Sequence, residues 1–128
     1  KRLDQNNTVR TKNLEHFLSL LDSEIFQTDF KVEGSSNYAF TLVLKRPDMI
    51  IRDKVESLLK GAGIEFRRGL SGGGNQLRQP YLRQNLDLPE PESMPNTDHV
   101  HHYAWYIGNF PELSSDNITW LGTVLKAI

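Results

Sequence analysis

The chain has 128 residues, 38% of them hydrophobic and 24% charged, which is the composition of one globular domain of ordinary size. Lysine and arginine number 15 against 16 acidic residues, so the net charge of −1 gives no electrostatic basis for binding nucleic acid or an anionic membrane. Cysteine is absent, which excludes disulfides and thiol chemistry, and no apolar run approaches the ~20 residues that span a bilayer. A cytoplasmic location fits these features.

The first half of the chain predicts a helix, a strand and a second helix. Four apolar residues near the start repeat with helical period and predict one buried stripe: Leu14, Phe17, Leu18 and Leu21. Residues 1–13 carry little apolar periodicity, so we expect a solvated helical extension that packs on a partner or frays. Residues 37–45 are rich in β-formers and predict a strand. Asp48 is expected to cap the next helix, with Gly61 just past its end.

A glycine-rich stretch follows a third predicted element. Residues 63–67 alternate apolar and polar side chains and predict a strand, which leads into Ser71-Gly72-Gly73-Gly74-Asn75. Adjacent glycines lose much backbone entropy on ordering, so they indicate either a mobile loop or a backbone that passes close to something. Residues 76–81 then supply side chains that can hydrogen-bond an oxygen-rich ligand. A plain surface hairpin loop explains the same residues equally well.

The last third predicts an exposed connection, a short helix, a strand and a final helix. Residues 86–96 contain three prolines and are expected to be extended on the surface. Residues 97–103 predict a short helix and residues 104–107 a strand, and Ser114 or Ser115 is expected to begin the last helix. Three short strands with helices between them predict an α+β fold, in which helices pack on one face of a small, mostly antiparallel sheet.

Candidate chemical groups are few. His99, His101 and His102 follow Asp98, but on a helix only His99 and His102 share a face, and no fourth ligand of similar quality is near. A histidine-rich surface that faces a partner or a pocket rim is therefore favoured over a metal site. A nucleophile elbow, a paired-acid motif and a P-loop are all missing from the sequence. The residues by themselves predict no catalytic, cofactor-binding or metal-binding group.

Four segments in order resemble one known family. They are Arg10 to Leu21; Glu33-Gly34-Ser35-Ser36 with the strand after it; Gly63 to Arg67 with Gly74-Asn75 and Arg78-Gln79-Pro80-Tyr81; and Pro95-Asn96-Thr97-Asp98 through Tyr106-Ile107-Gly108-Asn109. Together they resemble the C-terminal small domain of the DegT/DnrJ sugar aminotransferases, vitamin-B6-dependent enzymes of fold type I. The likeness is closest to the sugar 3-dehydratases, which use pyridoxamine phosphate to make 3,6-dideoxyhexoses, typically for bacterial lipopolysaccharide. Residues 68–73 depart from the family, which usually has a short apolar link there.

The resemblance implies a longer, cytoplasmic, dimeric enzyme. Residues 1–128 would be one domain of it, with residues 1–13 leading from an N-terminal large domain, and Lys1 as first residue agrees with this. Pyridoxal or pyridoxamine 5'-phosphate, with the lysine or histidine that serves it, would lie on the large domain, so that this chain alone is expected to hold no cofactor and to be inactive.

The resemblance also implies a substrate, a nucleotide-linked keto-sugar. Five residues are expected to bind it: Arg67, Asn75, Arg78, Gln79 and Tyr81. The alternative is a stand-alone, non-catalytic module that binds carbohydrate or protein.

Overall fold

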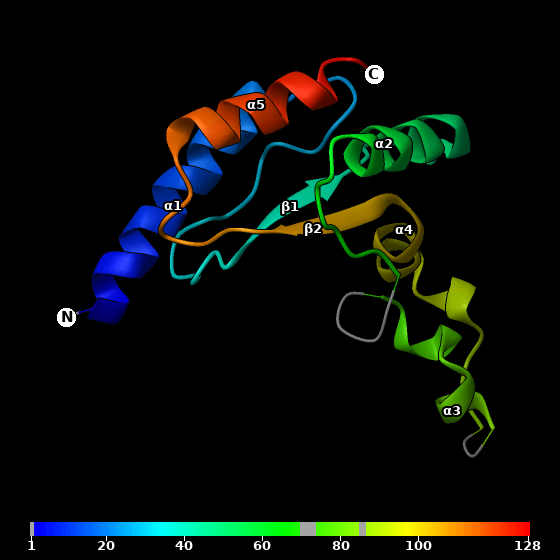
Figure 1. Cartoon of the computed structure of the whole chain (residues 1–128). Helices are drawn as coiled ribbons and strands as arrows, with labels where there is room; N and C mark the ends of the chain where they lie inside the picture. The colour runs from blue at the N-terminus through cyan, green and yellow to red at the C-terminus, as the bar shows by residue number, and fades with distance from the viewer. Residues whose placement is uncertain (1, 70–73, 85–86) are drawn as a thin grey trace.

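The structure, a computed structural model, describes residues 2–69, 74–84 and 87–128 (Figure 1). In chain order its elements are α1 (Arg2–Leu20), β1 (Ala39–Val43), α2 (Met49–Gly61), the 3₁₀ turn η1 (Gln76–Arg78), α3 (Pro80–Arg83), the 3₁₀ turn η2 (Pro91–Ser93), α4 (Pro95–Tyr103), β2 (Ala104–Gly108) and α5 (Ser115–Leu125).

A two-stranded antiparallel sheet lies at the centre of the molecule. In its register Phe40 pairs with Ile107, and Leu42 pairs with Trp105, so these four side chains share one face. All four are buried, and they form a single core with apolar residues of α1, α2 and α5. Figure 1 shows α1 and α5 side by side over the strands, with α2 beside them. The expected α+β fold, with helices on one face of an antiparallel sheet, is confirmed.

The third predicted strand is reduced to one residue pair. Arg67 forms an isolated antiparallel bridge with Tyr106, through Arg67 N to Tyr106 O at 3.1 Å and Tyr106 N to Arg67 O at 3.0 Å. The pairing does not lengthen on one side because Gly63 and Ile64 donate their N–H groups to the last turn of α2. On the other side Gly69, at φ +63, turns the chain just after Arg67. Residues 63–67 are therefore an edge bridge instead of a strand.

Gly63, and not Gly61, is the left-handed glycine that follows α2. Gly61 is the last residue of the helix, while Gly63 has φ +68, the left-handed conformation that a side chain disfavours. Its N–H donates to Lys60 O, and Ile64 N–H donates to Leu59 O, which is the paired hydrogen bonding of a Schellman motif. The left-handed glycine thus lies two residues later than the sequence predicted. Asp48 caps its other end as expected, because Oδ1 accepts from the amides of residues 50 and 51.

The proline-rich connection is also more regular than predicted. Pro91–Ser93 forms a 3₁₀ turn, and α4 begins at Pro95, two residues before the expected start. Proline is suited to the first helical position, where its missing N–H would have had no helical partner. Ser114 caps α5 as expected, with its Oγ accepting from Asn117 N.

Buried asparagines tie α1 to the end of the sheet. Asn109 Nδ2 donates to Arg10 O and to Asn37 O, both at 2.8 Å, and Asn13 Nδ2 donates to Asn109 Oδ1 at 3.2 Å. Asn37 has φ +46 and donates in turn to Thr11 Oγ1. Residues 2–13 therefore belong to a continuous helix that is held at its middle. Over residues 2–69, 74–84 and 87–128, none of the helices combines the length and the apolarity needed to cross a membrane.

Candidate functional site

Asn75 is buried where the glycine-bearing segment, here Gly69 and residues 74–78, contacts α4. Its side chain is 1% exposed, and its Nδ2 donates to Pro91 O at 3.1 Å and to Asp98 Oδ1 at 3.2 Å. Its Oδ1 accepts from Leu77 N and so caps η1, while its own backbone N–H donates to His101 Nδ1 at 3.1 Å. Every polar group of Asn75 thus has a partner within the chain.

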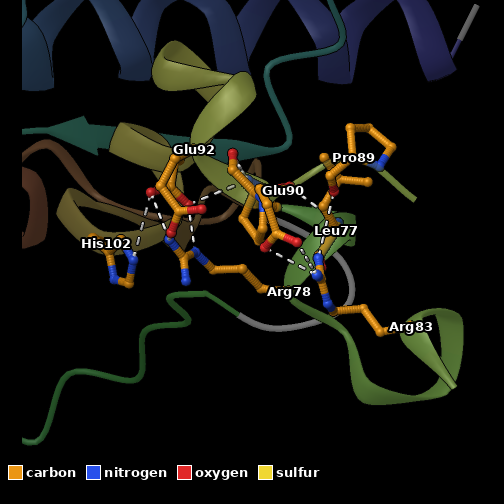
Figure 2. Close-up of polar contacts among 10 residues, drawn as sticks. Leu77, Arg78, Arg83, Pro89, Glu90, Glu92 and His102 are labelled. Atoms are coloured by element: carbon orange, nitrogen blue, oxygen red, sulfur yellow. Dashed lines mark hydrogen bonds and ion pairs between the residues drawn. The ribbon is translucent and has the colours of Figure 1, made fainter. Parts of the chain in front are cut away.

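Arg78 lies between two carboxylates. Its Nε and Nη2 donate to the two oxygens of Asp98, with Nη2 to Oδ2 at 2.9 Å, and Nη2 also donates to Glu92 Oε1 at 2.7 Å (Figure 2). The forked hydrogen bond from Arg78 lowers the pKa of Asp98 to about 2, against partial burial, and the same contact raises the pKa of Arg78. A backbone hydrogen bond, and then Arg78, lower the pKa of Glu92. This arrangement keeps all three groups charged.

A second arginine holds the segment that follows. Figure 2 shows Arg83, at the end of α3, directed toward Glu90. Arg83 Nη2 donates to both carboxylate oxygens of Glu90, at 2.9 and 3.0 Å, and Nη1 donates to Leu77 O at 3.2 Å. Arg78 and Arg83 therefore connect residues 76–83 to residues 90–98.

Two glycines are needed where the backbone passes His101. A Cβ placed on Gly74 would lie 2.6 Å from His101 Nδ1 and 2.8 Å from the carbonyl of Gly69. A Cβ on Gly69 would lie 3.0 Å from His101 O. For these two residues the close-approach interpretation of the glycine-rich stretch holds. The predictions that concern residues 71–73 fall outside the described residues.

The chain just before Gly69 is anchored to α2. Arg68 Nε donates to Glu56 Oε1, which also accepts from Trp105 Nε1 at 3.1 Å, and Lys60 Nζ lies 3.3 Å from Glu56 Oε2. Burial raises the pKa of Glu56, but the hydrogen bonds from Arg68 and Trp105 outweigh it, and the net pKa is below the ordinary value. The segment is thus attached to α2 before the glycines and to α4 after them.

The structure brings together only part of the predicted binding set. Asn75 and Arg78 meet at Asp98, and Gln79 follows directly, but its backbone closes η1 and leads into α3. Tyr81 is 54% exposed, and its hydroxyl donates to Gln76 Oε1 at 2.8 Å. Arg67 is exposed and lines a different hollow, described below. Substrate contact by these five residues stays a prediction.

The sequence reasoning missed Asp98 and His101 as partners of this segment. Both lie on one face of α4, three residues apart, and that spacing was the available signal. The other histidines have separate roles: His99 Nε2 donates to Leu44 O at 2.7 Å, and His102 Nε2 lies 3.9 Å from Asp98 Oδ2. In the part of the chain that the structure describes, no three histidine, aspartate or glutamate residues are placed to hold a metal ion.

An apolar groove of about 710 Å³ lies on another side of the molecule. It runs between the bridge at Arg67, the end of β2 and α5. Three aromatic residues that line it are about half exposed: Tyr38, Phe110 and Trp120, at 62%, 50% and 49%. Exposed aromatic residues that gather in one hollow are typical of surfaces that bind another molecule.

Comparison with known proteins gives one consistent relationship. No family model matches the chain. A curated protein from Escherichia coli, GDP-4-keto-6-deoxy-D-mannose 3-dehydratase, is 28% identical over 127 residues, which are 98% of this chain and 32% of that protein. Two solved structures of this dehydratase, one described with a trapped PLP-glutamate geminal diamine and an E. coli one with bound hydrated PLP, match with a TM-score of 0.81 and 27% identity. They too are covered over 32% of their length.

A more distant match extends the likeness of the fold. A protein from Streptococcus pneumoniae, described as a sugar aminotransferase in its PMP form, has a TM-score of 0.74 at 14% identity, again over 98% of this chain. The resemblance of the chain to the C-terminal part of such B6-dependent sugar enzymes is confirmed. The chain spans about a third of the length of the relatives that it matches.

Proposed function

We propose that this chain is the small domain of a vitamin-B6-dependent enzyme that acts on a nucleotide-linked keto-sugar, as a 3-dehydratase or an aminotransferase. The observation that carries the proposal is the match to the dehydratase over 98% of this chain, with a TM-score of 0.81. A likeness that includes nearly every element, at 27% identity, supports a shared role for the domain. Residues 1–128 would form one domain of a cytoplasmic, dimeric enzyme, and α1 would lead from a larger domain.

Pyridoxal or pyridoxamine phosphate would supply the electron sink in such an enzyme. The described residues that line two hollows of this chain do not fit the cofactor. The groove beside α5 has no lysine among the residues that line it, and Lys45, which lines a hollow beside α4, shares that hollow with Glu92 and Asp98. A phosphate there would face two carboxylates. We therefore assign cofactor binding to the larger domain and derive no step through the cofactor here.

The apolar groove supports the proposal that a larger domain packs on this one. Three half-exposed aromatic residues are costly to leave in water, and their area would stabilise a domain interface at about 25 cal/mol per Å² buried. Arg67 lines the same groove, so it would lie at the boundary between the two domains. A substrate held between the domains could then meet its guanidinium group.

We further propose two different roles for the predicted binding residues. Arg67, Gln79 and Tyr81 would contact the substrate directly. Asn75 and Arg78, whose polar groups bind Asp98 and its neighbours, would hold the segment that carries Gln79 and Tyr81. The geometry supports this division because the guanidinium of Arg78 already has two anionic partners.

The test begins with the coding sequence on both sides of this chain and continues with the protein that it encodes. We expect a larger domain with the pattern of a B6 enzyme, and turnover of GDP-4-keto-6-deoxymannose or a related nucleotide sugar when pyridoxamine phosphate and glutamate are supplied. The 128-residue chain alone should neither bind the cofactor stoichiometrically nor turn over the sugar. Tight carbohydrate binding by a product that begins near residue 1 would instead favour a stand-alone module.

A further inference from the structure

His101 lies directly against the backbone of the glycine-bearing segment. Its Nδ1 accepts the backbone N–H of Asn75 at 3.1 Å, and the backbones of Gly69 and Gly74 pass so close that neither position has room for a Cβ without movement. The imidazole is thus enclosed by main chain on one side and by α4 on the other.

The hydrogen bond at Nδ1 determines the state of the ring. A backbone N–H can only donate, so Nδ1 must carry a lone pair, and the proton of the neutral ring must be on Nε2. In the imidazolium both nitrogens carry protons, and Nδ1 can no longer accept. Protonation would therefore place two donors against each other at Asn75.

The charges around His101 come from every element that packs near it. On α4 the imidazole of His102 lies with its ring centroid 4.7 Å from that of His101, and Asp98 lies one turn before it. The positive charges of Arg78, in η1, and of Arg68 also act on the ring. Burial, then His102 and Arg78, and more weakly Arg68, lower the pKa of His101 below its ordinary 6.5, while Asp98 opposes them.

We propose that His101 is a pH-dependent conformational switch. In its neutral form it holds Gly74 and Asn75 against α4, and on protonation it releases the Asn75 amide and loosens the segment that continues into η1. This conformational change does not depend on the proposed function of the chain. Its consequence, that Gln79 and Tyr81 lose their placement for a substrate, rests on the function proposed above.

The direction of the effect follows from proton linkage. When the segment is released, His101 would have an ordinary pKa. In that arrangement it binds a proton more readily than it does in the closed arrangement. The closed arrangement is therefore fully favoured above pH 6.5 and loses stability as the pH falls below that value. The Arg78–Asp98 pair still holds η1 to α4, so we expect local loosening instead of unfolding.

The experiment is NMR on the 128-residue chain at about pH 7.5 and about pH 5, which bracket an ordinary histidine pKa. Imidazole ¹⁵N shifts should show His101 as the Nε2–H form at the higher pH and should give a titration midpoint below 6.5. Hydrogen exchange, corrected for its intrinsic pH dependence, should show the Asn75 amide opening about fivefold or more at the lower pH, the factor that corresponds to one ordinary hydrogen bond.

Two variants give the matched comparison. His101→Gln cannot be protonated, so the pH response of Asn75 should disappear, whereas His102→Gln, one residue away, should keep it. An Nδ1–H form in the unmodified chain, or a pH response that survives His101→Gln, would overturn the proposal. The imidazole ¹⁵N shifts of the unmodified chain test the proposal even if His101→Gln fails to fold. If the switch is found here but His101→Gln leaves the pH dependence of KM unchanged in the longer enzyme, the proposed substrate role of the segment fails and the switch remains.

Discussion

Gly122 of α5 lies against Leu20 of α1 so closely that a Cβ on the glycine would be 2.8 Å from the Cβ of the leucine. The two helices therefore approach each other at a position where only a hydrogen atom fits. By contrast, nothing lies within 4 Å of a Cβ placed on Gly61, at the end of α2. One chain thus holds two helical glycines with opposite environments.

These glycines provide the first prediction. Gly122→Ala should destabilise the fold by about 1–3 kcal/mol, because α1 and α5 would have to move apart. Gly61→Ala, the matched control, should stabilise it by roughly 0.5–1 kcal/mol through lower backbone entropy in the unfolded chain. Urea unfolding of both variants measures the difference. Equal effects would mean that the two helices do not approach in this way.

The second prediction compares Arg78→Ala with Arg83→Ala. Asp98, the partner of Arg78, has a side chain only 18% exposed, whereas Glu90, the partner of Arg83, is 75% exposed. Loss of Arg78 leaves a sheltered carboxylate without its counterion, so this variant should lower Tm by a few degrees. Arg83→Ala should change Tm less, because exposed ion pairs contribute little. An unchanged Tm for Arg78→Ala, with a raised KM in the longer enzyme, would assign Arg78 to the substrate instead.

Acid unfolding tests the same cluster through Asp98. Its folded pKa of about 2 is below the ordinary 3.8, so the ionised carboxylate stabilises the fold above about pH 4, and this contribution is lost as the pH falls toward 2. Asp98→Asn should therefore be less stable than the unmodified chain at neutral pH and should match it near pH 2. Urea midpoints measured across this range check the convergence. A constant difference at every pH would show that charge is not the cause.

The fourth prediction concerns Asn109. This side chain is buried and bonds to two carbonyl groups, so Asn109→Ala leaves Arg10 O and Asn37 O without their donor. The expected loss is about 1–3 kcal/mol in the free energy of unfolding. Asn117→Ala removes the same amide group from an exposed position and should have almost no effect. Similar losses for the two variants would contradict the buried network.

The two tryptophans make the fifth prediction. Trp105 is 2% exposed and Trp120 is 49% exposed. In Trp120→Phe the remaining fluorescence should be blue-shifted and resistant to acrylamide, whereas in Trp105→Phe it should be red-shifted and readily quenched. If a larger domain covers the groove, Trp120 should become protected in the longer protein. A Trp120 that stays fully quenchable there would remove the groove from the proposed interface.

Local signals in the sequence were sufficient for much of the fold. The caps at Asp48 and Ser114 and the buried stripe of α1 depend on neighbours within one or two turns, so periodicity and side-chain chemistry predicted them. The end of α2 was misplaced because Gly61 and Gly63 are both suitable C-terminal residues, and only the backbone conformation distinguishes them.

The candidate site depended on contacts that no local pattern reveals. Arg78 was predicted to bind a ligand from its side-chain chemistry and the family resemblance, whereas its partner in the structure, Asp98, is twenty residues away in sequence. The need for glycine at position 74 likewise comes from His101, on a helix that the chain reaches only later. Such contacts follow from how η1 lies on α4, which is a property of the folded chain.

The apolar core described above contains no residue between Arg67 and His102 among those that the structure describes. Within this stretch, the described residues that form η1, α3 and η2 are linked to one another and to α4 by hydrogen bonds and ion pairs, and Arg68 is linked to α2. The side chains of this stretch can therefore be exchanged during evolution with little change in the packing that keeps the sheet and helices folded. Substitutions in this stretch could therefore change its surface while the sheet and helices that form the core stay the same.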